Sequence, residues 1–196
     1  GLGIAADIKI KDEQDFSHSI AQCRAILRDN SHLKFYGGFS FTGSAAKWDG
    51  FGSGRFVLPR IVLSKDQLTL TVIEQSDIEQ AKFDVQQMSF RPASFDSDFP
   101  AFKSTNYTPT FDGWQSRIDE ALSLIRSEVL EKIVLSRKTV LKFEDTLNPI
   151  HLASELQTAT HDCYVFCFNF EMGNAFVGAT PEKLFCRQGN HLESEV

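Results

Sequence analysis

The stretch EKIVLSRKTV, residues 131–140, raises the first question about chemistry in this sequence. Its apolar residues alternate with polar ones, and this period of two predicts a β-strand. Lys132 shares one face of the predicted strand with Val134, whereas Ile133 and Leu135 share the other face. Because Lys132 begins an otherwise core-like strand, it is the first candidate for a chemical role.

Helices and further strands are expected on both sides of this stretch. Apolar residues at spacings of three and four predict helices over 12–30, 111–130 and 148–159. Asp112 and Gln115 are expected to cap the second helix, and Asn148 and Pro149 to begin the third. Strands are predicted over 33–42, 55–63, 67–75, 163–171 and 174–180, with a hairpin over 183–196.

The order of these elements predicts an α+β fold with a largely antiparallel sheet and flanking helices, because most strands follow one another through short connections. Residues 77–110 carry three prolines and a Ser/Asp cluster, so we expect them to run irregularly over the surface. The length of 196 residues suits one domain or part of a larger one.

Composition excludes several classes of function. The net charge of −6 and scattered Lys and Arg argue against a nucleic-acid partner. No segment approaches the roughly 20 apolar residues of a membrane helix, and the N-terminus does not resemble a signal peptide. The four cysteines have no CxxC spacing, which predicts reduced thiols and a cytoplasmic protein.

Two other stretches carry candidate chemistry. Gly50, Gly52 and Gly54 form a GxGxG pattern, but the pattern leads into a predicted strand and therefore offers no helix N-terminus to a phosphate. In FVGATPEKLF, residues 176–185, a turn presents Glu182 between two β-type runs. A glutamate at such a turn is most often a solvated residue, so Glu182 gains weight only together with Lys132.

The segments KIVLSR and FVGATPEKLF together resemble the chorismate-utilising enzymes, and within them the isochorismate synthases. Lys132 and Glu182 stand 50 residues apart in these two segments. FYGGFSF, the aromatic loop with Trp48 and Phe51, and FVLPRI are similar to the menaquinone-pathway branch, with the siderophore branch second. The resemblance covers essentially all 196 residues and implies the fold of anthranilate synthase component I.

The resemblance implies that the substrate is chorismate, that Lys132 is the general base and that Glu182 is the general acid. Water would attack ring carbon 2 while the hydroxyl on carbon 4 departs. A lysine base must be neutral and a glutamate acid must be protonated, so we expect both side chains to be buried. Ammonia-using relatives typically carry Gln in place of this lysine, so the chain resembles a water user.

Two other functions stay open at this point. Salicylate synthases share the lysine and the glutamate but go on to eliminate pyruvate. A non-catalytic chorismate-binding module could also keep this fold.

The resemblance further implies a Mg²⁺ cofactor, whose carboxylate ligands are expected outside residues 1–196, in the C-terminal half of the family's domain. Residues 1–196 would then be a single partial domain, truncated at both ends, that corresponds to the first half of the catalytic domain. We expect such a chain to be inactive alone and to self-associate through exposed apolar surface.

Overall fold

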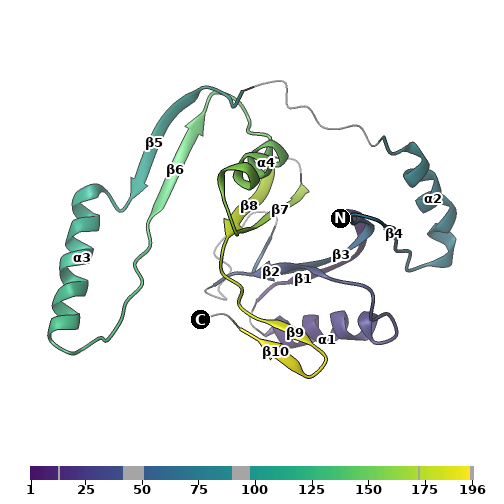
Figure 1. Cartoon of the computed structure of the whole chain (residues 1–196), viewed down its shortest axis with the longest axis horizontal. Coiled ribbons are helices and arrows are strands. Elements are labelled where there is room, and N and C mark those ends of the chain that lie inside the picture. Colours follow the sequence, from purple (N-terminus) through teal and green to yellow (C-terminus); the bar gives the residue numbers. More distant parts are fainter. Residues whose placement is uncertain (13, 42–50, 90–97, 172, 195–196) are drawn as a thin grey trace. The chain divides into compact units, whose positions relative to one another are not determined.

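The structure, a computed structural model, describes every residue except 13, 42–50, 90–97, 172 and 195–196. The chain divides into two compact units, shown with their elements in Figure 1. Unit 1 comprises Gly1–Ser94 and Phe166–Val177, and unit 2 comprises Phe95–Val165 and Gly178–Val196. Trp48 and Gly50, singled out in the sequence, lie outside the described residues.

Unit 1 is built on an antiparallel sheet with β3 (Gly54–Leu63) at its centre. β3 pairs antiparallel with β1 (Leu2–Ile10), β2 (Tyr36–Phe39) and β4 (Leu68–Leu70). Helix α1 (Asp15–Leu27) contacts β1 and buries Cys23. The apolar core of the sheet consists of Ile8, Ile10, Val57, Leu58 and Ile61.

These elements confirm the predicted N-terminal helix and the antiparallel hairpin of 33–42 with 55–63, with shorter bounds for the helix and the first strand. The strand predicted over 67–75 is largely wrong, because only Leu68–Leu70 pairs with β3. The chain then enters the short 3₁₀ helix η1 (Gln75–Asp77).

The expectation of an irregular segment over 77–110 is wrong at both of its ends. Helix α2 (Ile78–Gln87) forms at one end, and Ile78, Ala81 and Val85 occupy its less exposed face. Their spacings of three and four are typical of a helix. The prediction of an irregular segment gave more weight to the nearby prolines. At the other end lies the strand β5 (Phe102–Thr108) of unit 2.

Unit 2 contains a two-stranded antiparallel ladder of β5 with β6 (Lys138–Phe143). Between them runs helix α3 (Phe111–Arg126), and α4 (Pro149–Ala159) follows β6. The predicted start of α4 is confirmed, because Asn148 Oδ1 accepts hydrogen bonds from the amides of Ile150 and His151 at 2.9 and 3.2 Å.

The predicted cap of α3 is wrong by two residues. Thr110, not Asp112, is the N-cap, and its Oγ1 accepts a hydrogen bond from the amide of Gly113 at 3.5 Å. Asp112 instead lies in the first turn, where its carboxylate is favoured by the helix dipole.

The strand predicted over 131–140 is wrong in its first seven residues. β6 begins only at Lys138, which pairs with Thr108, the last residue of β5. The next residue, Pro109, has no amide to donate, so the ladder ends there. Residues 131–137 have the alternation of a strand but find no paired strand among the described residues.

The C-terminal part consists of β7 (Tyr164–Glu171) paired with β8 (Asn174–Thr180) and of β9 (Cys186–Gln188) paired antiparallel with β10 (His191–Glu193). The hairpin predicted over 183–196 is therefore confirmed. The described elements as a whole confirm the prediction of helices mixed with antiparallel sheet. Within the described part of the chain, no helix is both long enough and apolar enough to span a bilayer.

Candidate functional site

Lys132 lies in the extended segment between α3 and β6, and its side chain is exposed. The segment begins where α3 ends, after Glu128 takes a positive φ of 58° and turns the chain back. The prediction of a buried lysine on a cavity-facing strand is therefore wrong for residues 1–196 as the structure describes them. Its role as a base stays a prediction.

Glu182 lies two residues after the end of β8, beyond the Thr180-Pro181 pair that was predicted to follow the strand. The amide of Glu182 donates a hydrogen bond to Thr180 Oγ1 at 3.2 Å, across Pro181. The Glu182 side chain is exposed, so its predicted burial is also wrong. Within the described residues, Lys132 and Glu182 share no hydrogen bond or ion pair, although both belong to unit 2.

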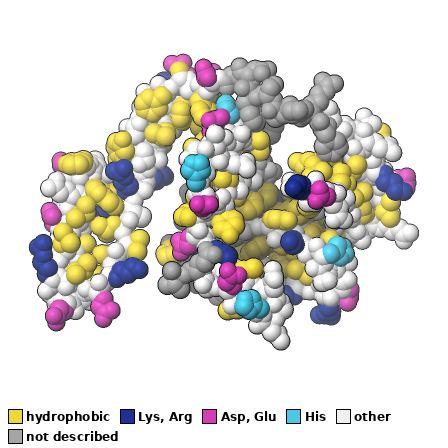
Figure 2. All heavy atoms as spheres, viewed as in Figure 1, with side chains coloured by type: hydrophobic (Ala, Val, Ile, Leu, Met, Phe, Trp, Pro, Cys, Tyr) yellow, Lys and Arg dark blue, Asp and Glu magenta, His cyan; other side chains and the backbone are white. Residues whose placement is uncertain are grey.

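Large apolar side chains stand exposed on both sides of Lys132. Val134 is 82% exposed, Val129 65% and Ile133 41%. Figure 2 shows hydrophobic side chains over the visible surface of α3, β5 and β6. Exposed apolar patches of this extent are uncommon on the solvent-facing surface of a monomeric protein. A layer that covered it would also take Lys132 out of water.

A magnesium site is the cofactor site that the resemblance implies. Mg²⁺ is held in proteins mainly by carboxylate oxygens and water. Among the described residues, no three His, Cys, Asp or Glu side chains come together in a way that could hold a metal ion. The residues present do not fit the metal, and we derive no chemical step through it.

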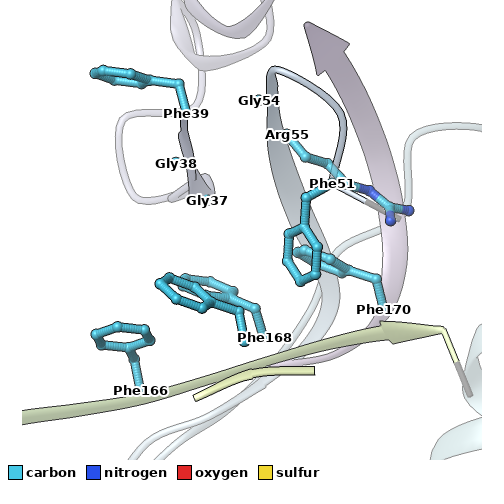
Figure 3. A pocket seen from close by; sticks show the side chains of 10 residues that line it. Gly37, Gly38, Phe39, Phe51, Gly54, Arg55, Phe166, Phe168 and Phe170 are labelled. Carbon is cyan, nitrogen blue, oxygen red and sulfur yellow. The ribbon is translucent and has the colours of Figure 1, made fainter. Parts of the chain in front are cut away.

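Unit 1 contains a cavity of about 340 Å³ that the sequence did not predict as a site. We call it the phenylalanine cleft. Figure 3 shows it from close by. Its aromatic walls come from β2, the turn before β3, β7 and β8, and consist of Phe39, Phe51, Phe166, Phe168, Phe170 and Phe176.

The rings of the cleft contact one another at its closed side. Phe51 lies 5.3 Å from Phe170 and 6.3 Å from Phe176 between ring centroids, within the range of favourable aromatic pairs. Phe166 and Phe168 stand 5.8 Å apart along β7. Because Phe166, Phe168 and Phe170 alternate along a strand, they share one face, and that face forms a wall of the cleft.

One charged side chain lines the cleft, and its charge is compensated. Arg55 is 5% exposed and donates two hydrogen bonds of 2.8 Å to the carboxylate of Asp7. Its guanidinium also lies 4.2 Å from the ring centroid of Phe170. This geometry combines a bidentate ion pair with a cation–π contact.

Glycines of β2 and β3 allow the close approach of strands at the cleft. A Cβ on Gly37 would collide with the carbonyl oxygen of Arg55, so this position needs glycine. A Cβ on Gly38 would meet no heavy atom within 4 Å. Two features of the sequence could have located the cleft: the pair Gly37-Gly38, which allows a close approach of backbones, and the alternating phenylalanines of 163–171.

Two cysteine thiols have altered acidity. Burial raises the pKa of the Cys23 thiol in α1, partly offset by a backbone hydrogen bond, and burial also raises the pKa of Cys167 in β7. All four cysteines are free thiols. Neither shift favours a nucleophile, because a raised pKa lowers the fraction of thiolate.

Comparison with known proteins gives consistent results. The model of a family described as chorismate binding enzyme matches residues 1–196. The chain is 28% identical to isochorismate synthase 2, chloroplastic, of Arabidopsis thaliana over 99% of its length, and 28% identical to isochorismate synthase MenF of Escherichia coli over 91%. It is 31% identical to the MenF of Bacillus subtilis over 81% of its length. The chain spans only 38%, 42% and 36% of the lengths of these three relatives.

Proposed function

Because this chain belongs to the chorismate-binding enzyme family, we propose that it forms part of an isochorismate synthase that converts chorismate to isochorismate. The observation that carries the proposal is the match of the family model over the whole chain, together with relatives that are named isochorismate synthases. The MenF relatives favour a role in menaquinone biosynthesis. Dependence on Mg²⁺ and a cytoplasmic location are further parts of the proposal.

In the proposed reaction, Lys132 removes a proton from water as the water oxygen bonds to ring carbon 2. The ring double bonds shift, and the bond from carbon 4 to its hydroxyl breaks. Glu182 donates a proton to the departing oxygen, which leaves as water. One water is added and one is lost, so the product is an isomer of the substrate. Lysine and glutamate then recover their starting states by exchanging protons with solvent.

Both tasks require side chains that are shielded from water, because burial disfavours the ammonium and the carboxylate. Lys132 and Glu182 are exposed in residues 1–196. We therefore propose that the active form has an additional layer over this part of unit 2, and that residues 1–196 alone do not turn over chorismate. The exposed apolar side chains beside Lys132 support such a layer. They also lead us to expect that residues 1–196 alone self-associate, which concentration-dependent light scattering would measure.

The test is chromatography of chorismate incubated with Mg²⁺ and the whole protein that contains residues 1–196. We expect isochorismate from the parent, and at least about a 100-fold lower kcat/KM from Lys132→Ala and from Glu182→Gln, the usual range for a lost acid or base. Lys138→Ala and Glu144→Gln are matched controls, since both side chains are exposed and carry no proposed role.

Three results would contradict the proposal in different ways. Salicylate with pyruvate as product would assign the protein to the salicylate synthases. Chorismate binding without any product would favour a non-catalytic module. Equal activity of Lys132→Ala and Lys138→Ala would remove Lys132 from the mechanism while leaving the reaction in place.

A further inference from the structure

We propose that the phenylalanine cleft of unit 1 binds a flat, uncharged aromatic molecule. The cleft has a volume of about 340 Å³, which admits a small ring system and not only water. Six phenylalanine rings of the described residues line it, and Figure 3 shows Phe166 and Phe168 side by side along one strand, with Phe39 on another segment of the lining. An aromatic guest would replace water against several rings at once, and aromatic pairs gain more than their buried area alone provides.

The charge of the cleft determines the class of ligand. Among the described residues that line it, Arg55 is the one that carries a charge, and both of its hydrogen bonds to Asp7 are short, at 2.8 Å. An anion that entered the cleft would have to compete with the Asp7 carboxylate for the guanidinium or be buried without a partner, and both are costly. An anionic ligand is therefore disfavoured. Chorismate, which carries two carboxylates, does not fit, so this inference is independent of the proposed function.

The shape of the cleft favours a flat molecule. Gly38 lines the cleft without a side chain, and a Cβ placed there meets nothing within 4 Å. The space next to Gly38 in β2 is thus open, whereas the backbone of β3 fills the space next to Gly37. A planar ring can lie against such a bare strand, and a bulkier group added at Gly38 would occupy the same space.

The test uses two probes that differ by one carboxylate, naphthalene and naphthalene-2-carboxylate, in equilibrium dialysis against the 196-residue chain. We expect naphthalene to bind more tightly than its carboxylate, and chorismate not to displace it. Gly38→Leu places a side chain in the open space and leaves all the phenylalanines in the sequence, and Phe168→Leu removes one aromatic ring from the lining. Each is expected to weaken binding by about tenfold, the effect of losing one good aromatic contact with its buried area.

The control is Phe83→Leu, the same chemical change at a residue of α2 that is 54% exposed and does not line the cleft. Its affinity for naphthalene should equal that of the parent, and far-UV circular dichroism should show all variants folded. Undetectable naphthalene binding, or equal binding by the parent and both cleft variants, would overturn the site. Tighter binding of the carboxylate would overturn the uncharged class of ligand, and displacement by chorismate would overturn the independence of this site from the proposed reaction.

Discussion

The ion pair of Asp7 with Arg55 should be a main support of unit 1, and Asp7→Asn tests it. Arg55 is 5% exposed and Asp7 25% exposed, and two hydrogen bonds of 2.8 Å join them across β1 and β3. Asp7→Asn takes the bidentate carboxylate partner away from the buried guanidinium of Arg55, and breaking a buried pair costs about 3–5 kcal/mol. Because Asp7 is partly exposed and asparagine can still accept one hydrogen bond, we expect the free energy of unfolding to fall by about 3 kcal/mol.

The assay is urea unfolding followed by far-UV circular dichroism, with midpoint and slope compared between variants. Glu79→Gln is the matched control, because Glu79 forms an ion pair with Lys82 at 2.8 Å but is 84% exposed. A pair of this kind contributes less than about 1 kcal/mol. The reasoning would be refuted if Asp7→Asn shifted the free energy of unfolding no more than Glu79→Gln does. A double change, Asp7→Leu with Arg55→Met, should recover much of the loss, since no buried charge then remains.

Three further predictions concern the same unit. Leu58→Ala, at a side chain that is 1% exposed, should lower the free energy of unfolding by about 2–5 kcal/mol in the same urea assay. Gly37→Ala should disrupt the pairing of β2 with β3, seen as faster amide exchange in both strands, because its Cβ would collide with the Arg55 carbonyl oxygen; Gly38→Ala should exchange like the parent. Burial raises the pKa of the Cys23 thiol above its ordinary value of 9.0, so the folded state disfavours the thiolate. The contribution of Cys23 to the free energy of unfolding should therefore be fully present below pH 9.0 and be lost as the pH rises above it. Alkylation of Cys23, followed by mass spectrometry, should need a higher pH in the folded than in the unfolded chain.

Local signals in the sequence predicted the elements that are fixed locally. The Asn148-Pro149 pair predicted the start of α4, because a side-chain cap and a preset φ act within one turn. The spacing of apolar residues predicted α1, and short connections predicted the antiparallel hairpins. These features depend on contacts between residues close in sequence, so a single sequence contains the information that they require.

Pairing between distant strands could not be read from the sequence in the same way. β5 has the sequence FKSTNYT, which has little apolar alternation, yet it forms a strand because β6 lies beside it. Residues 131–137 alternate well, yet they form no strand because the ladder has ended at Thr108 and Lys138. The difference lies in which segment pairs with another strand. A pairing strand 30 residues away does not change the local pattern of apolar and polar residues, so that pattern cannot predict it.

The candidate residues show a similar division. The resemblance of two motifs to a family singled out Lys132 and Glu182, and in the structure Glu182 lies two residues after the end of β8. Their burial could not be predicted, because burial depends on what covers unit 2. The phenylalanine cleft required both the Gly-Gly pair and the alternating phenylalanines, which lie about 130 residues apart and are brought together only by the fold.

The two candidate regions differ in what each needs before it can act. The described walls, glycines and arginine of the phenylalanine cleft all belong to unit 1. The region of Lys132 contains the proposed base but leaves it exposed to solvent, and Val134, two residues further on, is 82% exposed. Whatever covers Val134 would exclude water from the same segment and favour the neutral amine. If Lys132 is the base that we propose, burial of apolar surface and activation of the base would be one event, and the covering layer would contribute to both stability and catalysis.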